Sequence, residues 1–152
     1  MTYKEKITDI DYVFVEQDKI EDTDFEQIVN LLFKYLQRFI SKDALERDVK
    51  YCLNNGRVLT AYYDGILIGA IVGVHTPFFD KFHIAHIAVK EGYQGKGIGT
   101  TLTKKIIPEN KDASVHINLG NKGVEEFYKK IGFDSTHTRL KRMKDKESKP
   151  SD

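Results

Sequence analysis

The feature that most restricts the fold of this chain is the segment IAVKEGYQGKGIGTTL, residues 87–102, in which closely spaced glycines separate an apolar run from an amphipathic one. Backbone amides in the first turn of a helix lack intrahelical acceptors and lie at the positive end of the helix dipole. Gly95, Gly97 and Gly99 therefore let an anion such as a phosphate approach the backbone, and Gln94 and Lys96 add donors. A flexible loop that uses its glycines only for turning is less compatible with the tight spacing between strand and helix.

The glycine spacing argues against two common phosphate-binding loops. The P-loop requires Lys-Ser/Thr after its second glycine, whereas Gly97 is followed by Ile98. The Rossmann fingerprint is G-x-G-x-x-G, whereas this loop reads G-x-G-x-G and begins several residues after the strand. A nucleotide-binding fold of either kind is therefore disfavoured.

Hydrophobic periodicity predicts six strands and four helices. The strands are expected at residues 11–16, 57–63, 66–74, 82–89, 113–119 and 133–143, and the helices at 23–41, 43–55, 97–107 and 122–131. Asp64-Gly65 predicts a two-residue hairpin turn. Capping-box spacing marks the starts of the first two helices, at Thr23 with Glu26 and at Asp43 with Glu46. The pattern predicts a mixed sheet flanked by helices.

Length and composition indicate one ordinary globular domain. A chain of 152 residues buries about 70% of its unfolded surface, and 24 basic against 23 acidic residues imply no polyanionic partner. The N-terminal residues lack the apolar core of a signal peptide, and the longest apolar run, residues 66–74, is too short to span a bilayer. We expect a cytoplasmic protein without membrane or nucleic-acid partners, with one domain at 1–144 and a disordered, apolar-free tail at 145–152.

The single cysteine, Cys52, excludes internal disulfides and cysteine-rich zinc sites. Its place among helically spaced apolar residues predicts a buried core thiol rather than a nucleophile. No metal site is expected.

Two motifs together resemble the GNAT superfamily of acyl-CoA-dependent N-acyltransferases. Residues 94–99 read Q-x-x-G-x-G, and NKGVEEFYKKIGF, residues 121–133, is similar to the family's N-x-x-A-x-x-F-Y-x-x-x-G-F, with Val124 in place of the alanine. The resemblance covers about residues 56–133 and is loose over the N-terminal helices. It implies an α/β (mixed α+β) fold with a central mixed, mostly antiparallel sheet and helices on both faces. It also implies transfer of an acetyl group from acetyl-CoA to an amine by direct attack in a ternary complex.

The resemblance also implies which residues hold the co-substrate. Backbone amides of the loop and helix start would bind the CoA diphosphate, and amides at the end of the fourth strand would stabilise the oxyanion. The implied cofactor-binding set is Ile87, Ala88, Val89, Gln94, Gly95, Lys96, Gly97, Ile98, Gly99, Thr100, Asn121 and Phe127.

Acyl transfer also needs an acid, and the second motif assigns this role to Tyr128. A phenol with a pKa of about 10 can protonate a thiolate whose thiol has a pKa of about 8.5 at little cost. An amphipathic-helix tyrosine with its ring in the core and its hydroxyl at the surface is the alternative interpretation.

A base is needed because deprotonating an alkylamine at pH 7 costs about 4.6 kcal/mol. His116, on the polar face of its predicted strand, and His83, on the preceding one, rank nearly level. His86 ranks third because it faces the side opposite to His83 unless a bulge intervenes. Strand histidines are more often satisfied polar residues than catalysts.

The acceptor is expected to be a small-molecule or protein amine. Residues 1–26 carry nine acidic against three basic side chains, which weakly favours a cationic acceptor. The main alternative is an inactive acyl-CoA-binding sensor or assembly module, which would not need Tyr128 or the histidines. One strand follows Phe133 where the family has two, so the sheet edge is either open or completed by a second copy in a homodimer.

Overall fold

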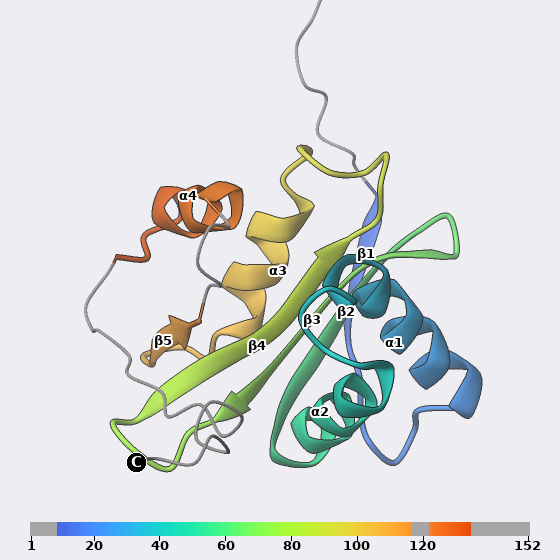
Figure 1. The fold of residues 1–152 in the computed structure, drawn as a ribbon, viewed down its shortest axis with the longest axis horizontal. Coiled ribbons are helices and arrows are strands. Elements are labelled where there is room, and N and C mark those ends of the chain that lie inside the picture. The colour runs from blue at the N-terminus through green and yellow to red at the C-terminus, as the bar shows by residue number, and fades with distance from the viewer. Residues whose placement is uncertain (1–8, 117–121, 135–152) are drawn as a thin grey trace, which may run out of the picture. The chain divides into compact units, whose positions relative to one another are not determined.

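A computed structural model describes residues 9–116 and 122–134 of the chain (Figure 1). They belong to two units, Met1–Asn118 and Leu119–Asp152. The described part of the first unit contains, in order, β1 (Ile10–Phe14), α1 (Asp22–Leu36), α2 (Lys42–Asn55), β2 (Gly56–Tyr63), β3 (Ile66–His75), β4 (Lys81–Val89), α3 (Ile98–Ile106) and β5 (Asp112–Val115). The described part of the second contains α4 (Lys122–Lys130).

The five strands form one sheet in the order β1-β2-β3-β4-β5. The first three pairings are antiparallel, and β4 pairs with β5 in parallel. The prediction of a mixed, mostly antiparallel sheet is therefore confirmed. Hairpins join β2 to β3 and β3 to β4, α1 and α2 lie between the antiparallel neighbours β1 and β2, and α3 lies in the crossover to the parallel strand β5.

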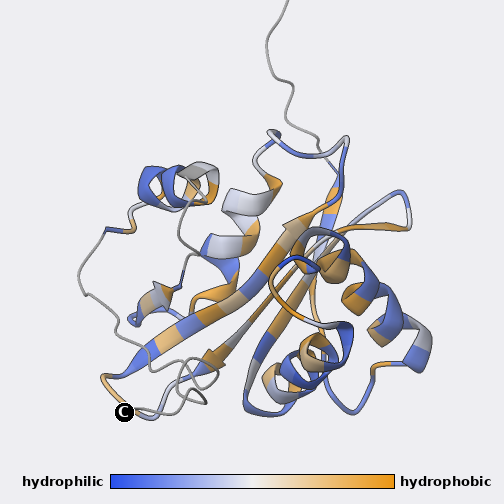
Figure 2. Ribbon diagram, in the orientation of Figure 1, coloured by the Kyte–Doolittle hydropathy of each residue, from blue (hydrophilic) through white to orange (hydrophobic). Residues whose placement is uncertain are grey.

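Helices cover both faces of the sheet, as expected (Figure 1). On one face α1 and α2 pack on the central strands through a buried cluster of Ile28, Val29, Leu32, Leu45, Val49, Cys52, Val58, Ala70, Val72 and Ala88. On the other face α3 packs through Ile98, Leu102 and Ile106, and the side chains of Ile98 and Leu102 lie over Gly69. Figure 2 shows the corresponding apolar residues along the central strands. Burial of these two apolar layers is the main favourable term in the folding of this unit.

The hairpin predicted at Asp64-Gly65 is confirmed. Both residues have positive φ, 50° and 75°, as a two-residue turn matched to strand twist requires. Local turn chemistry therefore set the register of the two pairs beside the turn, Tyr63 with Ile66 and Tyr62 with Leu67, and a bulge then shifts the register of the remaining pairs.

The predicted helix starts are wrong in detail. Helix α1 begins at Asp22 after Glu21, without a side-chain cap, and it ends at Leu36 rather than near Ser41. Ser41, not Asp43, caps α2, since its Oγ accepts a hydrogen bond from the backbone N–H of Ala44 at 3.2 Å. Because Ser41 is used as this cap, α1 cannot extend to it.

Three further predictions fall wholly or partly outside the described residues. These are the strand at 133–143, the tail at 145–152 and the second half of the strand at 113–119, of which Asp112–Val115 is observed. Phe133 and Asp134 are described and are not in a strand. Within the described ranges, no helix is long and apolar enough to cross a bilayer.

Candidate functional site

The sheet opens along the second half of β4. Strand β4 pairs with β5 only from Lys81 to Ile84, whereas it pairs with β3 as far as Val89. In the described part of the chain, residues 85–89 therefore have a strand on one side only. This stretch contains Ile87, Ala88 and Val89, the expected oxyanion donors. Amides on an unpaired strand edge are available to a ligand, which is the geometry that an oxyanion site needs.

A β-bulge interrupts β4 where the sheet opens. Val72 lies opposite His86 while Gly73 lies opposite Ile84, so Ala85 is the additional residue. Val74 lies opposite His83, and Val72 and Val74 share the face that packs against α1 and α2. His86 and His83 therefore lie on the same face. The expectation that His83 and His86 face opposite sides of the sheet holds only for an uninterrupted strand.

His83 and His116, the two histidines ranked highest as bases, lie together. Ser114 is the register partner of His83 on β5, and its Oγ lies 3.0 Å from His83 Nδ1. The ring of His116, which directly follows β5, lies 4.7 Å from the ring of His83. Parallel pairing of β4 with β5 thus gathers three polar side chains beside the opening of the sheet.

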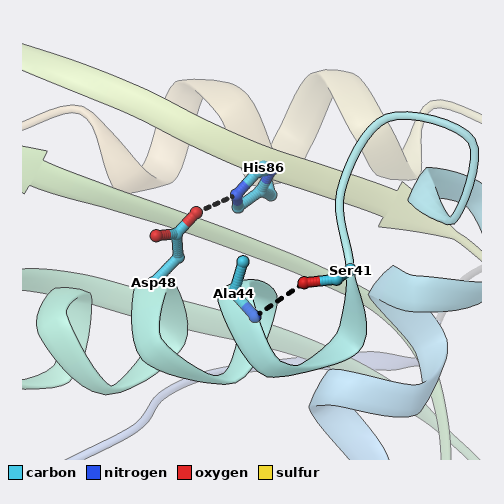
Figure 3. A network of polar contacts seen from close by, with 4 residues as sticks. All are labelled: Ser41, Ala44, Asp48 and His86. Carbon is cyan, nitrogen blue, oxygen red and sulfur yellow. Dashed lines mark hydrogen bonds and ion pairs between the residues drawn. The ribbon is translucent and has the colours of Figure 1, made fainter. Parts of the chain in front are cut away.

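His86 forms a hydrogen bond with Asp48 of α2 (Figure 3), with Nε2 and Oδ2 2.8 Å apart. The Ser41 cap on Ala44 fixes the first turn of the same helix (Figure 3). Sequence reasoning missed Asp48. The available signal was its position three residues after Leu45 and four before Cys52, which puts a carboxylate on the sheet-facing stripe of α2.

The predicted glycine loop connects β4 to α3. Gly92, Gly95 and Gly97 have positive φ values of 91°, 76° and 88°. Gly97 is the N-cap of α3, no side chain caps that helix, and a Cβ on Gly97 would meet open space. Gln94 uses its side-chain N–H to donate to Val89 O at 2.8 Å, so part of its donor capacity closes the loop. The first-turn amides of α3 thus lie beside open space, with no side chain occupying the helix start.

Residues 122–134 hold the described part of the second motif, and Asn121 lies outside the described residues. Tyr128 on α4 is 2% exposed, and its ring makes edge contacts with Phe127 and Phe133. Burial raises the pKa of Tyr128, so the phenol is protonated at neutral pH. The same rise increases the difference between the pKa of the phenol and that of a thiol. Complete proton transfer from Tyr128 to a thiolate therefore costs more than ordinary pKa values imply.

Cys52 is a buried thiol, as predicted. Burial and then the neighbouring Asp48 raise its pKa to about 12. A thiol that stays protonated is a poor nucleophile, so no acyl-enzyme role is supported.

Comparison with known proteins gives one consistent result. The family model described as "Acetyltransferase (GNAT) family" matches residues 25–133. Probable N-acetyltransferase san of Drosophila melanogaster is 31% identical over 87 residues, which cover 52% of this chain and 47% of that relative. The chain thus spans about half the length of that relative.

Solved acetyltransferases share the fold. An aminoglycoside N-acetyltransferase, AAC(6')-Iy, in complex with CoA has a TM-score of 0.67 at 17% identity, covering 89% of this chain and 94% of its own. Ribosomal-protein-alanine N-acetyltransferase from Brucella melitensis biovar Abortus 2308 has a TM-score of 0.62 at 16% identity, covering 88% and 99%.

Proposed function

Since this chain belongs to the GNAT acetyltransferase family, we propose that it transfers an acetyl group from acetyl-CoA to an amine by direct attack in a ternary complex. The observation that carries this proposal is the continuity of the open edge of β4 with the glycine loop and the uncapped start of α3. An anion held at α3 and a thioester carbonyl at residues 87–89 would belong to one extended ligand. CoA has that composition, with a diphosphate and a thiol at the two ends of its pantetheine arm.

In the proposed reaction the amine nitrogen attacks the thioester carbonyl, the C–N bond forms and the C–S bond breaks. Strand amides alternate in direction, and the N–H of Lys90 donates to Ile68 O on β3. Among residues 87–89 the amide of Ala88 therefore faces β3, whereas the amides of Ile87 and Val89 face the open edge and stabilise the oxyanion. Their position on the unpaired part of β4 supports this role.

The proton from the amine passes to the cluster of His83 and His116. Their mutual contact and the bond to Ser114 beside the opening support this assignment. The Asp48–His86 pair is the alternative that the geometry raises, because a carboxylate bonded to Nε2 favours the tautomer whose Nδ1 accepts a proton. Substitution distinguishes the two, as described below.

Tyr128 donates the proton to the departing CoA thiolate. The motif around it supports this role, and the burial that raises its pKa means that complete proton transfer to the thiolate costs more than ordinary pKa values imply.

The acceptor is a cationic amine, either a small molecule or a protein N-terminus. The acetyltransferases with similar folds are named for aminoglycosides and for ribosomal-protein alanine, which defines two arms of the test. We would incubate the protein with acetyl-CoA and an aminoglycoside, a polyamine or an alanine-terminated peptide, and measure release of free thiol. At least one amine should accelerate thiol release and appear as its acetylated product.

Calorimetry with CoA completes the test. If the protein binds CoA and yet releases no thiol from acetyl-CoA with any amine of a broad panel, that result would favour the inactive sensor over the enzyme. No binding of CoA to the folded protein would overturn the proposal as a whole.

A further inference from the structure

We infer that Tyr35 on α1 is a positioning residue for the glycine loop, and that its hydroxyl increases affinity for the diphosphate of CoA. The inference rests on the proposed function, because it assigns CoA as the ligand of the loop. It adds a residue from outside both motifs, contributed by a helix 56 positions away in sequence from the residue it bonds.

The contact joins the helical layer to the first residues of the loop. The backbone N–H of Glu91 donates to the hydroxyl oxygen of Tyr35 at 2.7 Å. The Tyr35 ring is partly buried against the α1/α2 core cluster, and Lys34 Nζ lies 5.7 Å from its centre. Core packing therefore holds the ring in place, and the hydroxyl reaches the loop.

Two other bonds fix neighbouring residues of the same segment. The N–H of Lys90 donates to Ile68 O at 2.7 Å, and the Gln94 side chain donates to Val89 O at 2.8 Å. Ile68 is itself the additional residue of a bulge in β3, since Ala61 lies opposite Gly69 and Tyr62 opposite Leu67. The Tyr35 bond is therefore the one of these three that connects the loop to α1.

The loop needs such bonds because of its composition. Gly92, Gly95 and Gly97 all adopt positive φ, and glycine loses more backbone freedom on ordering than any other residue. A ligand that binds only the ordered loop has its apparent affinity reduced by the fraction of molecules in which the loop is disordered. A side chain that holds the loop in its ordered form therefore improves binding without touching the ligand.

Tyr35→Phe tests this role, because it keeps the ring and removes only the hydroxyl. One hydrogen bond in a partly exposed site predicts a loss of CoA affinity of about two- to tenfold by calorimetry. Turnover at saturating acetyl-CoA should not change. Acetyl-pantetheine is an acetyl donor that lacks the diphosphate. The kcat/KM for this donor should be the same in Tyr35→Phe and in the unsubstituted protein.

Tyr51→Phe is the matched control, since Tyr51 is 59% exposed on α2. Loss of its hydroxyl should change neither the affinity for CoA nor the kcat/KM for acetyl-CoA or acetyl-pantetheine. Equal CoA affinity in Tyr35→Phe and the unsubstituted protein would overturn the inference. So would an equal loss with both donors, which indicates a general structural effect. Failure of the unsubstituted protein to bind CoA would instead reject the proposed function and, with it, the ligand named here.

Discussion

Asp48 on α2 and His86 on β4 face each other between the helical layer and the sheet, with carboxylate and imidazole 2.8 Å apart. The pair lies one residue beyond the bulge at Ala85, where β4 leaves β5. Its side chains differ in exposure, 16% for His86 and 46% for Asp48, so solvent screens the interaction in part. This hydrogen bond thus ties α2 to the part of β4 that borders the opening.

The first prediction concerns this pair. Asp48→Asn, His86→Gln and the double variant should give a coupling free energy of about 1 kcal/mol by denaturant unfolding, because one partner is half exposed. Turnover of each single variant should stay within a few-fold of the unsubstituted protein. If Asp48→Asn lowers turnover as much as replacement of His116 does, the general base is His86 rather than His83 or His116.

The second prediction concerns the histidine cluster. His116→Gln and His83→Gln should each lower kcat/KM for the acceptor by about a hundredfold or more, since positioned bases contribute factors of this size. The kcat/KM of the double variant should be only slightly below that of the less active single variant, because the two histidines act as a unit. CoA affinity by calorimetry serves as the control and should not change. Full activity in both single variants would exclude the cluster as base.

The third prediction concerns the acid. Tyr128→Phe should lower kcat much more than it changes the KM for acetyl-CoA, because the phenol acts only as the thiolate leaves. The ring contacts with Phe127 and Phe133 persist in this variant, so the melting temperature should fall little. Steady-state kinetics with varied acetyl-CoA measures both constants. Unchanged kcat would remove Tyr128 from the mechanism.

The fourth prediction separates backbone strain from ligand binding. Gly97 and Gly65 have similar positive φ, 88° and 75°, and neither has a heavy atom within 4 Å of an added Cβ. Alanine at either position should therefore lower the free energy of unfolding by about 1 kcal/mol. Only Gly97→Ala should also weaken CoA binding, since its methyl group enters the space beside the α3 amides. Equal CoA affinity in the two variants would contradict the placement of the anion.

The fifth prediction concerns alkaline stability. The Cys52 pKa rises from 9.0 to about 12 on folding, so between these values the unfolded state releases a proton that the folded state retains. The free energy of unfolding should therefore fall as pH rises above about 9, by at most about 1.4 kcal/mol per pH unit for this group. Urea unfolding across this range measures the slope. Cys52→Ala should be less stable at pH 7 yet show a shallower decline, and an identical decline would assign the effect to Tyr62 and Tyr128, whose pKa values burial also raises.

Much of the fold followed from local sequence alone. Apolar runs bounded by turn signals predicted β2, β3 and β4, helical spacing predicted the buried faces of α2 and α3, and Asp64-Gly65 predicted the hairpin. Such features depend on residues within one turn or one strand, whose φ preferences and side-chain directions are local properties. The glycine loop belongs to the same class, because positive φ at Gly97 is a local demand.

The arrangement of the site required tertiary structure. Pairing with β3 placed the bulge at Ala85, and that additional residue put His86 on the same face as His83, which no count along the strand could decide. Parallel pairing brought Ser114 to His83, and helix packing brought Asp48 to His86 and Tyr35 to Glu91. Each of these pairs joins residues more than 30 positions apart, so their proximity depends on how separate elements pack, a property that local periodicity does not contain.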